Sequence, residues 1–259
     1  MSESDVIVLK IGGSVAGEDA AALDAIASLH DSGHSLVVVH GGGPLLDEWA
    51  GRLGLNTTFL RGLRVTDEQT RDLALAVLGG LANARIVAAL LTRAVPAVGL
   101  TGIDGGTLLA VREEADLGLV GRITRVDSAL MEELVENGRV PVVAPAALEE
   151  AATPEVLNVN ADSAAGAIAA SLGARLLVFV TDVPGVRAKD GKVLATLDRD
   201  KAKALVDDGT IEGGMLPKVE ACLIAVAAGC RAAIVEARAG DAIERLLAGE
   251  RVGTVFEAA

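Results

Sequence analysis

Two lysines stand where the sequence offers a place for an anion. Lys10 ends a run of strand residues that should be buried, and an ammonium group there is costly unless an anion meets it. Gly12 and Gly13 follow, and without Cβ atoms they let backbone N–H groups approach phosphate oxygens. Lys218 lies at the start of a predicted helix behind the glycine pair 213–214, where a cation is repelled unless an anion binds. These residues indicate phosphate binding.

A third glycine turn supports the same chemistry. His40 ends a second predicted strand and is followed by Gly41, Gly42 and Gly43, with Pro44 at the first position of a helix. A plain turn needs only one or two glycines, so we favour contact with a ligand. His40 itself has two interpretations, a catalytic group or a hydrogen-bonded core histidine, and the second is the commoner case.

Other reaction classes find no support in the sequence. Glu18 and Asp19 stand where a P-loop has Lys and Ser/Thr, and the sequence contains no G-x-G-x-x-G, G-x-S-x-G or H-E-x-x-H motif. A net charge of −13 and a pI near 4.7 leave no broad basic surface for nucleic acid. Cys222 and Cys230 show no metal-site spacing, and every apolar run contains a charge or a break within 18 residues. We expect a cytoplasmic protein with no membrane or nucleic-acid partner.

The predicted elements alternate between strand and helix. Buried strands are predicted at residues 6–11, 36–39, 96–100, 139–144 and 175–181. A hairpin at 57–65, after which Thr66 caps a helix, and an antiparallel pair at 107–111 and 119–126 complete the pattern. This order is typical of an α/β fold, a three-layer α-β-α sandwich with an open, mostly parallel sheet. Because no Ser/Pro-rich linker divides the chain, we expect two lobes, 1–145 and 146–259, that share one continuous sheet.

Polar residues also follow strands in the second predicted lobe. Asn160 is predicted to cap a helix, which places Asp162 in the first turn, and Asn158 adds more polarity than a cap requires. Thr181 and Asp182 end a later strand. Because the carboxyl ends of parallel strands meet at one edge of a sheet, all these groups gather there. The candidate reaction is phosphoryl transfer, which depends on positive charge placed around the moving group.

The same segments resemble the motifs of the amino acid kinase family, and the resemblance covers nearly the whole chain. It rests on six segments in the family's order: Lys10-Ile-Gly-Gly, His40-Gly-Gly-Gly-Pro, Gly62-Leu-Arg-Val-Thr-Asp67, Asn158-Val-Asn-Ala-Asp162, Thr181-Asp-Val-Pro-Gly185 and Gly213-Gly-Met-Leu-Pro-Lys218. The resemblance implies transfer of a phosphoryl group from ATP to the side-chain carboxylate of N-acetyl-L-glutamate, in arginine biosynthesis.

The resemblance also implies a role for each site residue. Lys10 and Lys218 would stabilise the transferred phosphoryl group, and Asp162 would hold both lysines by ion pairing. The acyl amino acid would be bound by Gly42, Gly43, Arg64, Asn158 and Asn160. The nucleotide would be bound by Gly12, Gly13, Thr181, Asp182, Gly213, Gly214 and Met215. The N-terminal lobe would thus bind the acyl amino acid and form the dimer, and the C-terminal lobe would bind ATP.

Two features of this chemistry are expected to be absent. A carboxylate acceptor is already ionised at pH 7, so no general base is needed. Mg²⁺ would be carried mainly by the ATP phosphates and water rather than by a protein metal site.

Only about five residues precede the first predicted strand, whereas family members that arginine inhibits carry an extra N-terminal helix. We therefore expect a homodimer that arginine does not inhibit.

Other functions on the same fold remain open. A lysine-pathway kinase would act on aminoadipate or glutamate, free or carrier-bound, and other relatives act on aspartate, carbamate or a nucleoside monophosphate. A protein of a different class would be a non-catalytic sensor of nucleotides or amino acids. Such a sensor would be expected to lose one of the lysines or Asp162, and the sequence has all three.

Overall fold

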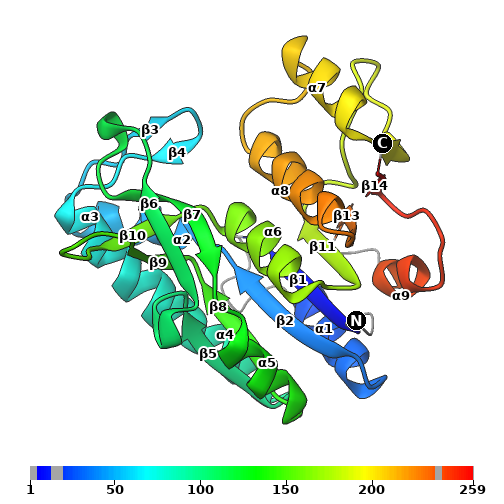
Figure 1. The fold of residues 1–259 in the computed structure, drawn as a ribbon, viewed down its shortest axis with the longest axis horizontal. Coiled ribbons are helices and arrows are strands. Elements are labelled where there is room, and N and C mark those ends of the chain that lie inside the picture. Colours follow the sequence, from blue (N-terminus) through cyan, green and yellow to red (C-terminus); the bar gives the residue numbers. More distant parts are fainter. Residues whose placement is uncertain (1–4, 13–19, 237–240, 259) are drawn as a thin grey trace.

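An open eight-stranded sheet forms the frame of the protein (Figure 1). The structure, a computed structural model, describes residues 5–12, 20–236 and 241–258. The strand order is β12-β14-β13-β11-β1-β2-β8-β5, and every neighbouring pair is parallel except β13 with β14. The strands are β1 (Val6–Ile11), β2 (Ser35–His40), β5 (Ala97–Thr101), β8 (Val140–Ala144), β11 (Leu176–Thr181), β12 (Thr196–Leu197), β13 (Arg231–Glu236) and β14 (Thr254–Phe256).

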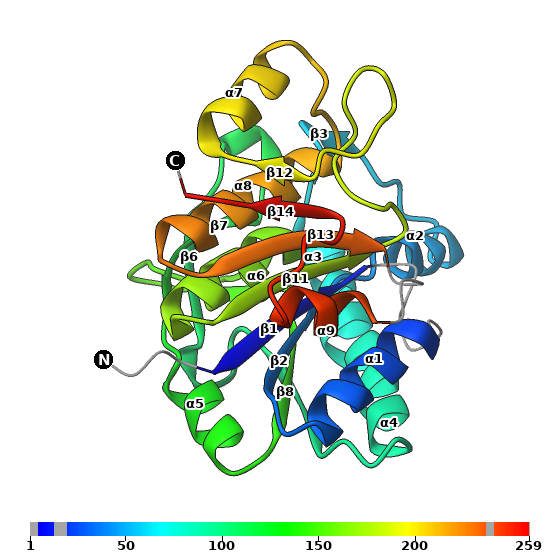
Figure 2. The same ribbon diagram turned by 90° about the vertical axis from the view of Figure 1, so that its right-hand side faces the viewer.

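Helices cover both faces of this sheet, which confirms the predicted three-layer sandwich (Figure 2). One face is packed by α1 (Ala20–Asp31), α4 (Asn83–Leu91) and α9 (Ala242–Leu247). The other face is packed by α5 (Ala129–Glu136), α6 (Ala161–Leu172) and α8 (Met215–Ala227). The side chains of β1 alternate between the layers, because Ile7, Leu9 and Ile11 join the first core and Val8 the second.

The large sheet is continuous across the predicted boundary at residue 145. Strands β1, β2, β5 and β8 come before it and β11 to β14 after it, and β1 pairs with β11 over five residues, from Ile7 with Leu176 to Ile11 with Val180. The lobes 1–145 and 146–259 themselves stay a prediction. Two short strands after the boundary, β9 (Ala146–Glu149) and β10 (Val156–Val159), hydrogen-bond with strands that precede it.

A smaller sheet and a hairpin extend the N-terminal half. β6 (Leu108–Arg112) and β7 (Val120–Val126) are antiparallel, as predicted, and close into a four-stranded ring with β9 and β10. The predicted hairpin consists of β3 (Phe59–Leu60) and β4 (Leu63–Arg64). Short 3₁₀ turns at Asp104–Gly106 (η3) and Ala115–Leu117 (η4) lie in the connections, and α7 (Arg199–Asp207) follows β12.

One long helical segment crosses the N-terminal half. It consists of α3 (Glu68–Ala74), a π-helical stretch η2 (Leu75–Ala82) and α4, and it packs against α2 (Gly43–Arg52) and strands β5 and β8. The glycine pair 79–80 therefore does not break the helix. In the described part of the chain this segment alone is long and apolar enough to cross a membrane by length and composition. A helix of a protein core meets the same criterion, and 44% of its most apolar window is buried here.

Candidate active site

Asp162 lies between the two lysines that the sequence singles out. Lys10 Nζ is 2.6 Å from Oδ1 of Asp162, and Lys218 Nζ donates a hydrogen bond to Oδ2 at 2.9 Å. The side chains of Lys10 and Asp162 are 8% and 9% exposed, and that of Lys218 is 18% exposed. Three segments that are far apart in the sequence therefore meet at one buried carboxylate.

Strand geometry and helix starts explain why these side chains meet. Lys10 has the same parity on β1 as Val8, so it points to the face that carries α6 and α8. Asp162 is in the first turn of α6, where Asn160 caps the helix by accepting hydrogen bonds from the N–H groups of Asp162 and Ser163 at 2.8 and 3.1 Å. Lys218 is in the first turn of α8.

The cluster carries a net positive charge that favours binding of an anion. Burial lowers the pKa of Lys10 below its ordinary value, while the Asp162 carboxylate raises this pKa and the nearby Lys218 ammonium lowers it. Lys218 Nζ also donates to the backbone oxygen of Gly214 at 3.0 Å. Two ammonium groups on one carboxylate carry a net positive charge, and the start of α8 adds the positive end of a helix dipole. This arrangement suits phosphate oxygens.

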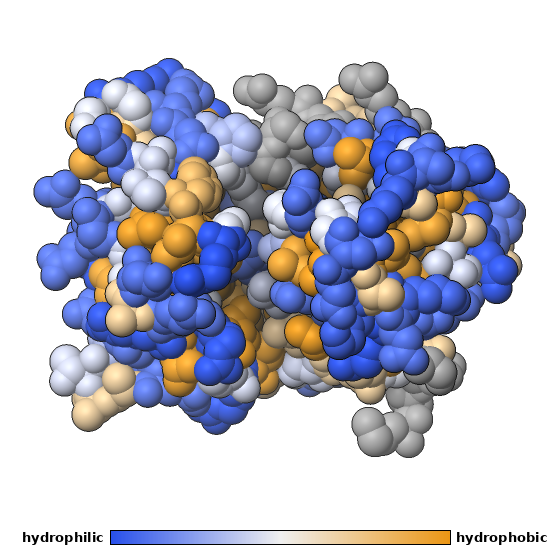
Figure 3. All heavy atoms as spheres, turned by 90° about the horizontal axis from the view of Figure 1, so that it is seen from above, coloured by the Kyte–Doolittle hydropathy of each residue, from blue (hydrophilic) through white to orange (hydrophobic). Residues whose placement is uncertain are grey.

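A cavity of about 160 Å³ opens beside the cluster. Its lining includes all five residues predicted to bind the acceptor: Gly42, Gly43, Arg64, Asn158 and Asn160. We refer to it as the acceptor cavity. It adjoins Asp162 through Asn160 and Ala161 at the start of α6. Seen from above, a hollow separates the two halves of the molecule (Figure 3).

Arg64 is held in the acceptor cavity by two neighbours. Its side chain is 7% exposed, Nη1 donates to Oδ1 of Asp47 at 2.7 Å, and the guanidinium carbon lies 4.6 Å from the centre of the Phe59 ring. The Thr66 hydroxyl donates to the backbone oxygen of Arg64 at 2.7 Å and accepts a hydrogen bond from Nδ2 of Asn158 at 3.2 Å. Thr66 thus connects two residues predicted to bind the acceptor.

The prediction that Thr66 caps the following helix is wrong, because its hydroxyl has other partners. Its buried hydroxyl is used by Arg64 and Asn158, and Asp67 caps α3 instead by accepting from the N–H of Thr70 at 2.8 Å.

Both the backbone and a neighbour of Gly42 favour glycine, because its φ of 158° is a conformation that L side chains rarely adopt. A Cβ at this position would lie 2.5 Å from Cδ2 of Leu78, a residue of the π-helical stretch, so a larger residue would require the Leu78 side chain to move. The adjacent Gly43 begins α2, and the two glycines present backbone to the acceptor cavity. The interpretation of this turn as a ligand contact stays a prediction.

A second cavity, also of about 160 Å³, lies near the start of α8. It is lined by Val183, Gly185, Val186, Arg187, Thr210, Glu212 and Met215. Among the residues predicted to bind the nucleotide, Met215 lines it, Gly213 and Gly214 directly precede Met215, and Thr181 and Asp182 directly precede Val183. Gly12 follows β1, and Gly13 lies outside the described residues. The lysine cluster thus shares α6 with the lining of the first cavity and α8 with the lining of the second.

Sequence reasoning missed several residues that line these cavities. Leu46, Phe59, Leu78, Val120 and Pro145 line the acceptor cavity, and Val186, Arg187, Thr210 and Glu212 line the second. Most are apolar, and nothing in their types distinguishes them from core residues. Gly185 could have been found, because it ends the segment Thr181-Asp-Val-Pro-Gly185.

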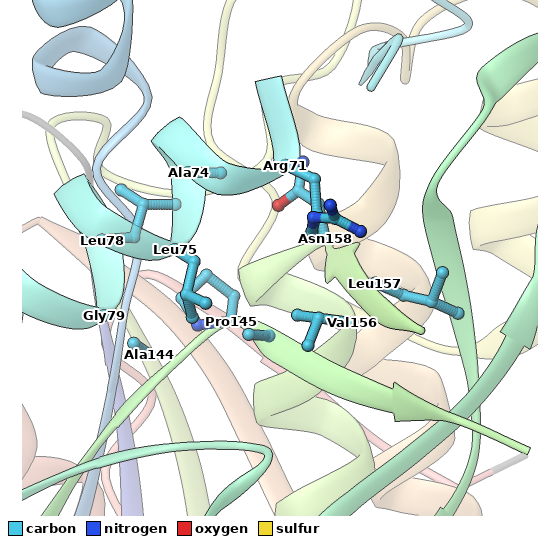
Figure 4. Close-up of a pocket in the computed structure, with 11 residues that line it drawn as sticks. Arg71, Ala74, Leu75, Leu78, Gly79, Ala144, Pro145, Val156, Leu157 and Asn158 are labelled. Atoms are coloured by element: carbon cyan, nitrogen blue, oxygen red, sulfur yellow. The ribbon is translucent and has the colours of Figure 1, made fainter. Parts of the chain in front are cut away.

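A small apolar cavity adjoins the acceptor cavity (Figure 4). The two share Leu78, Pro145 and Asn158 in their linings. Its polar end is formed by Arg71 and Asn158, and Arg71 Nη1 donates to Oε2 of Glu155 at 2.8 Å. The volume of about 10 Å³ holds one water at most.

His40 belongs to the core. It is fully buried, Nδ1 donates to the backbone oxygen of Gly41 at 2.8 Å, and Nε2 accepts from Nδ2 of Asn83 at 3.1 Å. Burial lowers the pKa of His40 to about 4, so the ring is neutral at pH 7. The structure therefore favours the core interpretation of His40. Cys222 is also fully buried, and burial raises the pKa of its thiol.

Metal-binding side chains do not cluster in the described part of the chain. Among them, no group of three or more His, Cys, Asp or Glu side chains could hold a metal ion. Both carboxylate oxygens of Asp162 face ammonium groups, which leaves this residue poorly suited as a metal ligand.

Comparison with known proteins identifies the family. The sequence profile of the amino acid kinase family matches residues 5–236. The chain belongs to this family. The acetylglutamate kinase of Dehalococcoides mccartyi is 39% identical over 255 residues, 97% of this chain and 94% of that protein. The acetylglutamate kinase of Koribacter versatilis is 45% identical over 228 residues, 86% of this chain and 87% of that protein.

A solved structure gives the same fold. The crystal structure of smu.665 from Streptococcus mutans UA159 has a TM-score of 0.84 at 29% identity, covering 99% of this chain and 100% of that chain. The amino acid kinase resemblance read from the six sequence segments is thereby confirmed at the level of family and fold.

Proposed function

We propose that the protein is an ATP-dependent acetylglutamate kinase. It would transfer the γ-phosphoryl group of ATP to the side-chain carboxylate of N-acetyl-L-glutamate, giving N-acetyl-L-glutamyl 5-phosphate for arginine biosynthesis. The observation that carries this proposal is the bridging of Lys10 and Lys218 by Asp162. One cavity lined by polar groups lies at the start of α6, which carries Asp162, and a second cavity lies at the start of α8, which carries Lys218. Relatives with this activity align with nearly the whole chain.

The two lysines would carry the chemistry. Phosphoryl transfer needs positive charge on the moving group and two oxygens held in line, and little covalent help from the protein. Lys10 and Lys218 would meet the phosphoryl oxygens, and Asp162 would fix both ammonium groups so that they need not reorganise during the reaction. The attacking carboxylate is ionised at pH 7, so the reaction requires no general base to deprotonate it.

The acceptor would be recognised by the groups that line its cavity. Arg64 would bind the α-carboxylate through its guanidinium fork, as expected for a planar group that matches a carboxylate. Gly42 and Gly43 would bind through backbone N–H groups, and Asn158 and Asn160 would position the remaining polar atoms.

ATP would lie on the other side of the lysine cluster. Its phosphates would contact Gly12 and Gly13 after β1, and its nucleoside would lie near these residues: Thr181, Asp182, Gly213, Gly214 and Met215. Mg²⁺, when bound, would neutralise phosphate charge and would be held by the nucleotide and water, since the described residues provide no cluster for it.

The assembly and location of the protein complete the proposal. We infer a homodimer in the cytoplasm, formed by the N-terminal half, without a membrane or nucleic-acid partner. The helical segment Glu68–Leu91 presents exposed small or apolar residues at Ala76, Gly80, Ala84 and Leu91, beside the edge strand β5 of the large sheet. Light scattering at micromolar concentration tests this point, and a monomeric mass would contradict it.

A panel of acceptors tests the activity. N-acetyl-L-glutamate, glutamate, aminoadipate, aspartate and carbamate are each supplied with ATP and Mg²⁺, ADP release is coupled to an optical assay, and hydroxylamine traps any acyl phosphate. We expect N-acetyl-L-glutamate to give both ADP and the hydroxamate. Preference for aminoadipate or glutamate would point to the lysine-pathway alternative, and binding without turnover of any acceptor would point to a sensor.

A further inference from the structure

The guanidinium of Arg64 has a carboxylate partner on a different element. Arg64 lies on β4, whereas Asp47 lies on α2, and the two side chains form an ion pair of 2.7 Å. The arginine side chain is 7% exposed and the aspartate side chain 45% exposed. The nearly buried charge of Arg64 is therefore paired with a carboxylate at the protein surface. Asp47 lies outside the sequence segment Gly62–Asp67 that contains Arg64.

Asp47 reaches Arg64 from outside the acceptor cavity. The residues that line the cavity include Arg64, Phe59 and Leu46, and Asp47 is absent from them. Its carboxylate is therefore not part of the cavity lining. Phe59 covers one face of the guanidinium at 4.6 Å and Asp47 holds the Nη1 atom. Since a guanidinium has five N–H donors in a fixed plane, fixing one nitrogen and one face fixes the direction of the others.

The contact also joins two parts of the acceptor site. Gly43 begins α2 and lines the cavity, and Asp47 is one helical turn further along the same helix. Through Asp47, the backbone donors at the start of α2 and the guanidinium of Arg64 take a set position relative to each other. The ion pair is thus a charged contact between α2 and the hairpin of β3 and β4.

We propose that Asp47 is a positioning residue for the acceptor: it holds the Arg64 guanidinium so that the α-carboxylate of the acceptor meets the guanidinium in fork geometry. This inference rests on the proposed function, because it assigns Arg64 to the acceptor. It acts on binding in the ground state and touches neither the lysine cluster nor the second cavity, so its effect falls on the KM of the acceptor.

Three single variants separate position from charge. Asp47→Ala removes the contact, Asp47→Asn keeps an oxygen that can accept from Nη1, and Glu48→Ala removes the same charge from the next residue of α2. Glu48 is 51% exposed and pairs with Arg52 on the same helix, so it is a matched control. We expect Asp47→Ala to raise the acceptor KM about tenfold, the loss expected for one charged hydrogen bond. Asp47→Asn should restore a KM within about twofold of the parent, because one neutral hydrogen bond is retained.

The remaining parameters identify the route of the effect. In Asp47→Ala, kcat and the KM of ATP should stay as in Glu48→Ala, and in an Arg64→Ala background Asp47→Ala should cause no further rise in the acceptor KM. A lower acceptor KM in both Asp47 variants would overturn the inference and make Asp47 a competing charge. An effect that persists without Arg64, or an Asp47→Ala variant equal to Glu48→Ala, would also overturn it.

The same assay keeps this inference apart from the proposed function. If the parent protein forms no hydroxamate from N-acetyl-L-glutamate, the proposed function fails. If the parent is active and Asp47→Ala behaves as Glu48→Ala does, only the positioning role fails. Equilibrium binding of N-acetyl-L-glutamate by calorimetry gives a second readout, in which Asp47→Ala should weaken the affinity by the same factor as the KM.

Discussion

Lys218 Nζ donates to Oδ2 of Asp162 at 2.9 Å, which leaves Oδ1 of that carboxylate to a second ammonium group. The two lysines therefore take fixed positions before any substrate arrives. A preorganised charge stabilises a transition state without the cost of moving into place.

This relationship predicts a specific defect for Lys218→Ala. The variant should lower kcat by about 10²–10³-fold, the range for losing one preorganised transition-state donor, and should raise the KM of ATP far less. Lys203→Ala, which removes an exposed lysine paired with Asp207 on α7, serves as the control. Steady-state kinetics provide the measurement, and a large rise in KM with unchanged kcat would assign Lys218 to ground-state binding.

Arg64→Ala should show the opposite pattern. Because Arg64 lines the acceptor cavity away from the lysine cluster, its loss should raise the acceptor KM by about 10–100-fold, the range for one or two charged hydrogen bonds, and leave kcat within a few fold. Arg61→Ala is the control, since Arg61 lies in the same hairpin and pairs with Glu114 at the surface. A selective loss of kcat would mean that the roles of Arg64 and Lys218 are exchanged.

Asp162→Asn should change the pH dependence at alkaline pH. Lys10 must be protonated to bind phosphate, so kcat/KM for ATP falls as pH rises through the Lys10 pKa, which burial places below its ordinary value. The Asp162 charge raises that pKa, and removing the charge should move the alkaline fall to lower pH. Residual activity followed from pH 7 to 10 measures the shift, with Asp207→Asn as control. A fall at unchanged or higher pH would contradict this account of Lys10.

His40 should make the folded state less stable in mild acid. Its pKa is about 4 in the folded protein and near 6.5 when unfolded, so between these values only the unfolded chain takes up the proton. This stability is complete above pH 6.5 and declines as pH falls to about 4, by about 3 kcal/mol in total. Urea unfolding at several pH values measures the slope, which should be smaller in His40→Asn than in the control His34→Asn. Equal slopes would show that another group is responsible.

Much of the site could be predicted because it follows from local rules. Strand parity puts Lys10 on the face of α6 and α8, and the cap at Asn160 puts Asp162 at the start of α6. Helix starts and glycine turns are encoded within a few residues. The fold class was accessible for the same reason, since alternating strands and helices favour a parallel sheet.

The remaining features depend on contacts between distant segments. Threonine is a common helix-capping residue, but the Thr66 hydroxyl forms hydrogen bonds with Arg64 and Asn158 instead. Asp67 therefore caps α3. Nothing in the sequence distinguishes Asp47 from other acidic residues on helices, because its contact with Arg64 depends on the position of the hairpin. The antiparallel strand β14 is three residues long, too short for its alternation to indicate a partner.

The pairing of β1 with β11 has a mechanical consequence for the exchange of substrates. Lys10 sits in a ladder that runs without interruption from the first half of the chain into the second, with Phe179 of β11 on one side and Val39 of β2 on the other. In the described part of the chain, β8 ends at Ala144 and β9 begins at Ala146, so no long linker lies at the predicted boundary, and the shared sheet opposes independent movement of the two halves. We therefore expect the two halves to move relative to each other through a change in the twist of this sheet, and the stiffness of its central strands to limit how far the Lys10 ammonium group is displaced during turnover.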